Sequence, residues 1–145
     1  MPKSRQPEGQ RAPSVRAVLD TNVVVSGFLT PGGTPARVLA LLDSRRLTAV
    51  YSGSILKEYE EVLARPKFAI NPRAIATYLS LLRLEGLRVT PVAIEDPSLP
   101  DPADFPFMVA ALAAACPVVT GDLRHFPRTT GVEAISPAEL LARLR

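Results

Sequence analysis

The sequence predicts an α/β fold in which the strands of a mostly parallel sheet alternate with helices. Short, β-branched apolar runs that end abruptly at polar residues recur along the chain, as in buried parallel strands. Segments with helical start and stop signals separate these runs, and right-handed crossovers then make the strands parallel. The length of 145 residues suits one domain with a sizeable core. Because no internal repeat or linker is visible, we expect a flexible tail at 1–14 and a single domain at 15–145.

In the first half of the chain, turn and capping residues separate two strands from four helices. The turn cluster over 30–33 contains one proline and two glycines, and it divides the first two helices. A proline near a helix start is favourable, because its fixed φ suits the first turn. The expected elements are a strand over 15–19, a helix over 21–29, a helix capped by Thr34 and running to about Arg46, a strand over 47–51, a helix opened by Ser52 or Ser54 and ended before Pro66, and a helix begun by Asn71-Pro72 with Gly86 as its C′ residue.

The second half begins with a strand-like run over 87–94, and Pro91 within it indicates an edge strand. The acidic, proline-rich stretch over 95–102 is expected to be a loop. The helix after it, from about Ala103 to Ala115, is apolar on nearly every side and should be buried. A strand is expected over 117–120 and another over 131–135. Ser136-Pro137 then begins the final helix.

Composition narrows the cellular setting more than the function. The net charge of +3 arises entirely from the first sixteen residues, so nucleic-acid binding cannot be argued from net charge. Cys116 is the single cysteine, which excludes an intrachain disulfide and a cysteine zinc site and fits a reducing cytoplasm. Residues 1–13 lack the apolar core of a signal peptide, and no apolar run approaches the length of a membrane span. We therefore expect a cytoplasmic protein with no membrane partner.

Three aspartates lie where predicted strands end or helices begin. Asp20 ends the first strand, Asp122 follows the strand over 117–120, and Asp104 lies near the start of the apolar helix. In a parallel sheet, the carboxyl ends of the strands and the starts of the following helices share one edge, where ligands bind. All three carboxylates should therefore fall on that edge, although periodicity alone does not give the strand order that would bring them together.

Each of these aspartates also has a purely structural interpretation. Asp20 could cap a helix or form an Asx turn, and Asp104 could interact with a helix dipole. Asp122 could be an ordinary turn residue after Gly121. The coincidence of three carboxylates at one edge favours a shared site over three separate structural roles.

Glu58 is a fourth candidate acid. On a helical wheel for residues 55–63 the apolar side chains form one face, and Glu58 lies at the margin of that face, one turn from Ser54. Glu61 lies clearly off the face. A solvated glutamate in an acidic triplet is the alternative interpretation, and this helix taken alone favours it.

Clustered carboxylates repel one another, so such a site needs a counter-charge or a proton. An oxygen-rich site without cysteine suits Mg²⁺ or Mn²⁺. Such ions, singly or as a pair about 3.5–4 Å apart, activate water and stabilise the leaving oxygen in phosphodiester cleavage. The residues alone therefore predict an acidic metal site and leave its substrate open.

The chain resembles the PIN-domain nucleases in four motifs that follow one another in the family's order. Together they extend from about Val15 to Ala138, nearly the whole predicted domain. The four motifs are Val18-Leu19-Asp20-Thr21-Asn22-Val23-Val24-Val25-Ser26-Gly27, then Ser54-Ile55-Leu56-Lys57-Glu58-Tyr59-Glu60-Glu61-Val62-Leu63 with Arg65-Pro66-Lys67-Phe68, then Asp101-Pro102-Ala103-Asp104-Phe105-Pro106-Phe107, and finally Val119-Thr120-Gly121-Asp122-Leu123-Arg124-His125-Phe126-Pro127. The sequence is most similar to the branch of toxins of toxin–antitoxin modules similar to VapC.

This resemblance implies a three-layer α/β/α fold and a Mg²⁺- or Mn²⁺-dependent endoribonuclease. It also implies RNA as substrate, a cognate antitoxin protein as partner and a homodimer. The residues that it assigns fall into two groups. Asp20, Glu58, Asp104 and Asp122 would be the catalytic, metal-binding carboxylates, and Asn22, Thr120 and Ser54 would be polar neighbours that orient ligands or water.

The sequence departs from the family pattern after Asp122. Many PIN domains carry a further Asp shortly after this position, where Leu123, Arg124 and His125 stand here. His125 could contact a water or a phosphate oxygen, and the alternative is an inert surface histidine. Asp101 competes with Asp104 for the third acidic role, and Asp104 is preferred because the apolar helix would hold it rigidly. The candidate phosphate contacts, for each of which solvated surface charge is the alternative, are Arg65, Lys67, Arg73, Arg124, His125 and Arg128.

Other functions remain open at this point. The same fold and metal could serve RNA processing or DNA cleavage outside a toxin–antitoxin module, and a non-catalytic PIN-like binding module is a further alternative. A phosphotransfer protein of the haloacid-dehalogenase type would use Asp20 as nucleophile and resembles Asp-x-Asp. Asn22 occupies the place of the second Asp, which argues against that alternative.

Overall fold

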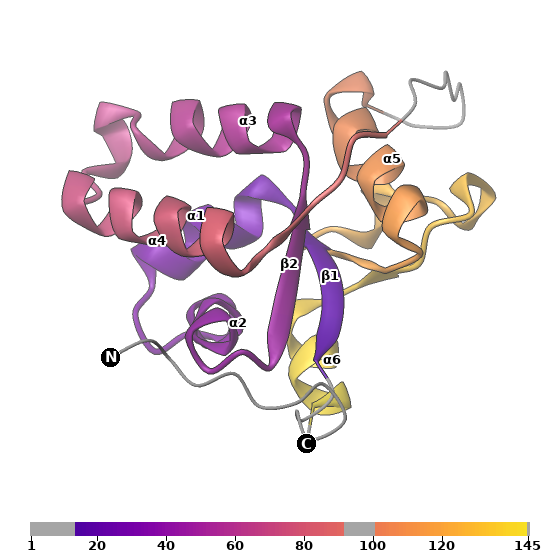
Figure 1. Cartoon of the computed structure of the whole chain (residues 1–145), viewed down its shortest axis with the longest axis horizontal. Helices are drawn as coiled ribbons and strands as arrows, with labels where there is room; N and C mark the ends of the chain where they lie inside the picture. The colour runs from indigo at the N-terminus through magenta and orange to yellow at the C-terminus, as the bar shows by residue number, and fades with distance from the viewer. Residues whose placement is uncertain (1–13, 92–100, 145) are drawn as a thin grey trace.

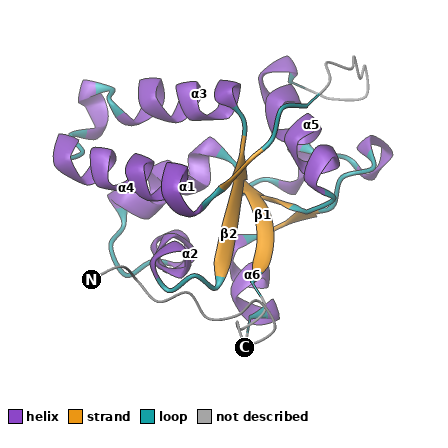
Figure 2. Ribbon diagram, in the orientation of Figure 1, coloured by secondary structure: helices purple, strands orange, loops and turns teal. Residues whose placement is uncertain are grey.

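The computed structural model describes residues 14–91 and 101–144 and contains a five-stranded, fully parallel sheet. The strand order is β3-β2-β1-β4-β5 (Figures 1 and 2). The strands are β1 Val15–Leu19, β2 Leu47–Tyr51, β3 Leu87–Arg88, β4 Val118–Val119 and β5 Ala134–Ile135. The predicted α/β class with a mostly parallel sheet is therefore confirmed.

Helices cover both faces of the sheet. Figure 1 shows α1 to α4 on one side of β1 and β2 and α5 on the other, which gives the expected three-layer α/β/α sandwich. The helices are α1 Thr21–Leu29, α2 Thr34–Asp43, α3 Gly53–Leu63, α4 Pro72–Glu85, α5 Phe105–Ala114 and α6 Pro137–Arg143. Short 3₁₀ turns cover Pro66–Phe68, Pro102–Asp104, Leu123–His125 and Arg128–Thr130.

Strand β1 lies at the centre of the sheet and of the core. Its residues Ala17, Val18 and Leu19 are completely buried, as expected for a strand covered by helices on both faces. The chain adds β2 and β3 on one side of β1 and then crosses over to add β4 and β5 on the other. The strand order therefore reverses between β1 and β4, and a ligand crevice is expected outside the carboxyl ends of these two strands.

The capping residues behave largely as the sequence predicts. Ser52, rather than Ser54, caps α3 by accepting from the backbone N–H of Ile55. Asn71 and Ser136 cap α4 and α6 in the same way. The expected cap at Thr34 is wrong by one residue: Gly33 occupies the N-cap position, and Thr34 is already helical.

Gly86 follows α4 as predicted, but for a different reason from the one expected. A C′ glycine usually adopts a left-handed conformation, whereas Gly86 is extended, with φ −79° and ψ 170°. A Cβ at this position would lie 2.9 Å from the carbonyl oxygen of Ala49 and closer still to that of Leu82. The position therefore excludes a side chain because the chain passes too close to α4 and β2.

Several expected elements are shorter in the structure. The buried helix expected from Ala103 begins as a 3₁₀ turn, becomes α-helical at Phe105 and exposes 39% of Leu112. The edge strand expected over 87–94 is confirmed as an edge, but it covers only two described residues, and its last three lie outside the described part. The strands expected over 117–120 and 131–135 also shorten to two residues each.

The tail expected at 1–14 lies outside the described residues, except for Ser14. None of the helices in the described ranges is long and apolar enough to cross a membrane.

Candidate active site

The carboxyl ends of β1 and β4 meet at a buried hydrogen bond between two polar side chains. Asp20 follows β1 and Thr120 follows β4, and the Thr120 hydroxyl donates to Oδ2 of Asp20 over 2.9 Å. Both residues are buried, with 5% of Asp20 and 1% of Thr120 exposed. Parallel pairing of the two strands places these residues side by side. The sheet edge at the reversal of strand order therefore carries a buried carboxylate with a fixed orientation.

The helix-cap interpretation of Asp20 is wrong. Asp20 occupies the N-cap position of α1, but its side chain makes no capping hydrogen bond. Its carboxylate instead turns across the sheet edge toward Thr120. Because capping does not use the carboxylate, a buried Asp20 needs another hydrogen-bond partner, and Thr120 is that partner.

Helix α3 brings Glu58 to the same edge. Ile55, Tyr59 and Leu63 are buried on one face of α3, and Glu58 lies half-buried beside that face. The hydroxyl of Thr21, directly after Asp20, donates a hydrogen bond to Oε2 of Glu58. Glu58 is therefore oriented toward the end of β1, which argues against the interpretation of it as a freely solvated glutamate.

A second contact holds α3 in this position. The phenol of Tyr59 donates to the backbone carbonyl of Leu19, the last residue of β1. Burial, together with the negative charges of its neighbours, raises the pKa of Tyr59 far above its usual value, so the phenol stays protonated and can donate. The two adjacent residues Glu58 and Tyr59 thus tie α3 to the end of β1.

Asp104 completes the buried part of the cluster. It ends the 3₁₀ turn before α5 and is only 7% exposed, and its Oδ2 is buried without a hydrogen-bond partner among the described residues. Burial and the charge of Asp20 raise its pKa from 3.8 to about 6. The charges of Asp101 and Glu58 act in the same direction, while His125 opposes them. Asp104 therefore lies among other carboxylates without enough positive charge to offset them.

Asp101 has a different role. It is exposed and caps the 3₁₀ turn, since its side chain accepts from the backbone N–H of Ala103 over 2.9 Å. The structure thus buries Asp104 and leaves Asp101 as a turn residue at the surface. This geometry favours Asp104 as the third acid.

Asp122 differs from the other acids because a cation already contacts it. Nε and Nη2 of Arg124 donate to Oδ1 and Oδ2 of Asp122 over 3.0 and 2.9 Å, and the backbone N–H of Arg124 donates to Oδ1 over 3.0 Å. These bonds lower the pKa of Asp122 from 3.8 to about 2. The turn interpretation is thus partly right, because the side chain caps the turn that contains Arg124.

His125 lies between Asp122 and Asp104. Its Nε2 is 3.6 Å from Oδ2 of Asp122, and its Nδ1 is 3.7 Å from Oδ2 of Asp104. Both distances exceed a normal hydrogen bond, and Nδ1 is buried without a partner among the described residues. His125 therefore faces the acidic cluster, which the sequence left undecided.

Of the three polar neighbours predicted from the sequence, Thr120 contacts the acidic cluster through its hydrogen bond to Asp20. Asn22 and Ser54 are exposed, and their side chains make no hydrogen bond to another described residue. The residue that the sequence interpretation missed is Thr21. The sequence feature that indicates a role for Thr21 is its hydroxyl group directly after Asp20, and the structure shows that Thr21 is buried.

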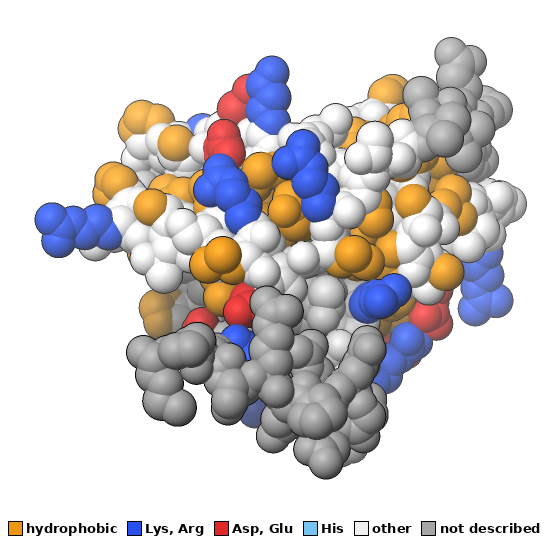
Figure 3. Space-filling model, viewed as in Figure 1, with side chains coloured by type: hydrophobic (Ala, Val, Ile, Leu, Met, Phe, Trp, Pro, Cys, Tyr) orange, Lys and Arg blue, Asp and Glu red, His pale blue; other side chains and the backbone are white. Residues whose placement is uncertain are grey.

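Only some of the basic residues predicted from the sequence to contact phosphate lie beside the acids. Arg65 and Lys67 follow the C-terminal end of α3, which points away from the sheet in Figure 1, and the Lys67 ammonium lies 5.0 Å from the centre of the Phe68 ring. Arg73 begins α4 beyond them. Figure 3 shows Lys and Arg side chains spread singly over the described part of this face rather than gathered in one patch. Arg124 and His125 are thus the basic groups that lie at the acids.

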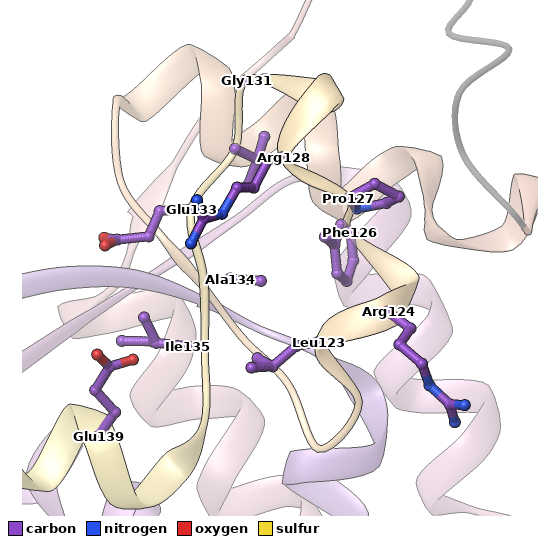
Figure 4. Close-up of a pocket in the computed structure, with 11 residues that line it drawn as sticks. Leu123, Arg124, Phe126, Pro127, Arg128, Gly131, Glu133, Ala134, Ile135 and Glu139 are labelled. Carbon is purple, nitrogen blue, oxygen red and sulfur yellow. The ribbon is translucent and has the colours of Figure 1, made fainter.

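One pocket in the described part lies beside the acidic cluster rather than within it. It has a volume of about 740 Å³ along the edge strand β5, and none of the four predicted acids lines it. In Figure 4, Leu123 and Ile135 border this pocket, Arg128 lies near Glu133, and the side chain of Arg124 points away from it. Arg124 thus begins at the wall of the pocket and extends to Asp122.

The donor set suits a hard divalent cation. All four acids carry carboxylate oxygens, and the buried Oδ2 of Asp104 has no hydrogen-bond partner among the described residues. In residues 14–91 and 101–144, no three His, Cys, Asp or Glu side chains are already close enough to form a complete metal site. The described acids therefore do not form a closed metal site by themselves. A bound ion would offset the charges of the neighbouring carboxylates, which together with burial raise the pKa of Asp104.

Comparison with known proteins relates this fold and site to others. A family model described as PIN domain matches residues 16–124. The uncharacterized protein MJ1680 of Methanocaldococcus jannaschii is 36% identical over 53 residues, which cover 37% of this chain and 34% of that protein. The chain thus matches about a third of the length of that relative.

Two crystal structures have a similar fold. VapBC2 from Rickettsia felis, bound to a DNA fragment from its promoter, superposes with a TM-score of 0.56 at 16% identity, covering 84% of this chain and 98% of that chain. FitAcB from Neisseria gonorrhoeae superposes with a TM-score of 0.52 at 23% identity, with the same coverage of both chains. At these identities the likeness establishes a shared fold.

Proposed function

Because the chain belongs to the PIN domain family, we propose that it is a divalent-metal-dependent endoribonuclease that acts as the toxin of a toxin–antitoxin module. The observation that carries this proposal is the position of Asp104. Its buried Oδ2 has no hydrogen-bond partner among the described residues, and its carboxyl group lies near the charges of Asp20, Asp101 and Glu58 at the edge of the sheet where α/β proteins bind ligands. A carboxylate in this situation is suited to bind a cation.

In this proposal Asp20, Glu58 and Asp104 hold Mg²⁺ or Mn²⁺, and Asp122 borders the site on its exposed side. The ion supplies activation of a water molecule and stabilisation of negative charge on the leaving oxygen. The protein contributes a fixed orientation of the carboxylates. Thr120 fixes that of Asp20 and Thr21 that of Glu58, so that fewer rotations remain to be frozen when the ion and the substrate bind.

Arg124 and His125 provide the basic side of the same site. The Arg124 side chain is 90% exposed beside Asp122, so it can reach a phosphodiester that approaches from solvent. His125 lies between two of the acids. We propose that these two residues contact the phosphate next to the bond that is cleaved. Arg65 and Lys67 follow the end of α3 that points away from the sheet, so we do not assign them this role.

RNA is the proposed substrate, and a cognate antitoxin protein and a second copy of this chain are the proposed partners, all in the cytoplasm. The four motifs that resemble VapC-type toxins support the antitoxin, and the fold shared with VapBC2 and FitAcB agrees with it. A non-catalytic PIN-like module would be expected to have lost its acids, whereas Asp20, Glu58, Asp104 and Asp122 are all present.

The test is cleavage of a mixed RNA by the purified full chain with Mg²⁺, with Mn²⁺ or with EDTA, alongside Asp20→Asn and Asp122→Asn. Cleavage is expected only with added metal, and both variants should lose it while keeping the circular dichroism spectrum of the native protein. A DNA strand of matched sequence serves as the second substrate. Cleavage in EDTA, or full activity of Asp20→Asn, would contradict the mechanism, and preferential cleavage of the DNA would contradict the proposed substrate.

A further inference from the structure

The four acids of the proposed site differ in whether the group that contacts them is neutral or positively charged. Asp20 and Glu58 accept hydrogen bonds from the neutral hydroxyls of Thr120 and Thr21. Within residues 14–91 and 101–144, Oδ2 of Asp104 has no hydrogen-bond partner. Asp122 alone is held by a guanidinium. The positive charge that the protein itself provides in direct contact is therefore concentrated at one end of the site.

The geometry at Asp122 uses both carboxylate oxygens. Nε of Arg124 reaches Oδ1 at 3.0 Å and Nη2 reaches Oδ2 at 2.9 Å, so the planar guanidinium lies across the carboxylate with two parallel bonds. This paired arrangement is the strongest form of the Arg–carboxylate contact. A backbone N–H also donates to Oδ1. Little of the carboxylate of Asp122 is left to coordinate a metal ion.

His125 separates the two ends of the site. It lies between the carboxylates of Asp122 and Asp104, within 4 Å of each. A guanidinium thus contacts the carboxylate of Asp122. Among the described residues, no cation lies within hydrogen-bond distance of the carboxylate of Asp104.

A second metal ion would have to bind next to this guanidinium. In two-metal sites the ions lie about 3.5–4 Å apart and share carboxylates. A dication held about 5 Å from a fixed guanidinium is repelled strongly enough, even in water, to bind roughly tenfold more weakly. It would also have to displace Arg124 from both oxygens of Asp122.

We propose that Arg124 takes the place of a second metal ion in this site, so that the chain binds one Mg²⁺ or Mn²⁺, held by Asp20, Glu58 and Asp104. This inference rests on the metal dependence proposed above and adds the number of ions and the role of Asp122. In this arrangement Asp122 is a positioning residue, which holds the guanidinium beside the ion.

The experiment is calorimetric titration of the full chain with Mn²⁺, which needs no substrate and no turnover. The wild-type chain is expected to bind one Mn²⁺. Arg124→Ala should bind a second ion more weakly than the first. Removing the guanidinium removes the repulsion that would otherwise weaken binding of that second ion by about tenfold. Arg128→Ala removes an exposed arginine from the next turn of the same segment and should still bind one ion. The Arg124–Asp122 pair lies at the surface and contributes little to folding, so Arg124→Ala is expected to fold.

A second pair of variants tests the same proposal from the side of the acids. Asp122→Asn should leave the affinity for the single Mn²⁺ within about threefold, whereas Asp104→Asn should weaken it by at least about a hundredfold, since it removes a ligand of the ion. Two ions bound by the wild-type chain, one ion bound by Arg124→Ala, or a loss of the ion in Asp122→Asn would overturn the inference and leave the proposed nuclease intact. RNA cleavage by a chain that binds no Mn²⁺ would overturn the proposed metal dependence and this inference with it.

Discussion

The hydroxyl of Thr120 and the carboxylate of Asp20 share a buried 2.9 Å hydrogen bond, although one hundred residues separate them along the chain. The same hydroxyl accepts from the backbone N–H of Asp122 over 3.1 Å. Thr120 thus connects an acid that follows β1 with an acid that follows β4. This one side chain therefore orients the carboxylate of Asp20 and holds the backbone at Asp122.

Replacing Thr120 by Val should therefore destabilise the fold and the site together. A buried hydrogen bond to a charged group contributes about 1.5–3 kcal/mol, and Val leaves Asp20 buried without its donor. We expect the free energy of unfolding, measured by urea titration, to fall by about 2 kcal/mol. Thr120→Ser keeps the hydroxyl, so its free energy of unfolding should fall by much less. Equal losses in the two variants would show that packing of the methyl group, rather than the hydrogen bond, is what matters.

Glu58 and Glu61 provide a matched pair on one helix. Glu58 is half-buried and bonded to Thr21, whereas Glu61 is exposed. Glu58→Gln should reduce RNA cleavage by about a hundredfold or more, in the range seen when one catalytic electrostatic group is removed. Glu61→Gln should change the rate by less than about twofold, because a solvated glutamate has no partner to lose. If the two variants behave alike, Glu58 is not part of the site.

Asp104 should make stability depend on pH. Its pKa is about 6 in the folded chain against a usual value of 3.8, so the folded state holds a proton more tightly than the unfolded state. Stability therefore decreases as pH rises from about 4 to 6 and stays reduced above that window. In EDTA, Asp104→Asn should melt roughly 3 °C higher than the wild type at pH 7.5, and the difference should vanish near pH 4. A difference that is independent of pH would contradict the raised pKa.

Added Mn²⁺ should offset the loss of stability that the charged Asp104 causes at neutral pH. An ion that binds only the folded chain stabilises it by about 2.7 kcal/mol at one hundred times its dissociation constant. The melting temperature of the wild type should rise by several degrees with Mn²⁺, and that of Asp104→Asn should change little. No shift in the wild type would count against a metal site at these carboxylates.

The elements that the sequence predicts most accurately are those set by local signals. The bounds of α1 and β2 agree with the prediction, because an apolar run and a turn residue limit each of them. The caps of α4 and α6 follow from Asn71 and Ser136 for the same reason. Asp20 and Asp122 were expected at one edge because parallel strands share a direction.

What the sequence could not provide depends on packing between distant segments. The bond from Thr21 to Glu58 needs the angle at which α3 crosses the end of β1, and no periodicity contains that angle. Arg65 and Lys67 belong to the second motif, but they follow the end of α3 that points away from the sheet. The exclusion of a side chain at Gly86 likewise reflects the approach of Ala49, which is far away in sequence.

The order of the strands also determines when the site can exist during synthesis. Of the described strands β1 is made first, and it lies between β2 and β4, so one side of β1 has no neighbouring strand until β4 has been added. A growing chain that already carries Asp20, Glu58 and Asp104 still lacks Thr120, which orients the first of these acids. The strand order thus delays assembly of the proposed nuclease until β4 has been made.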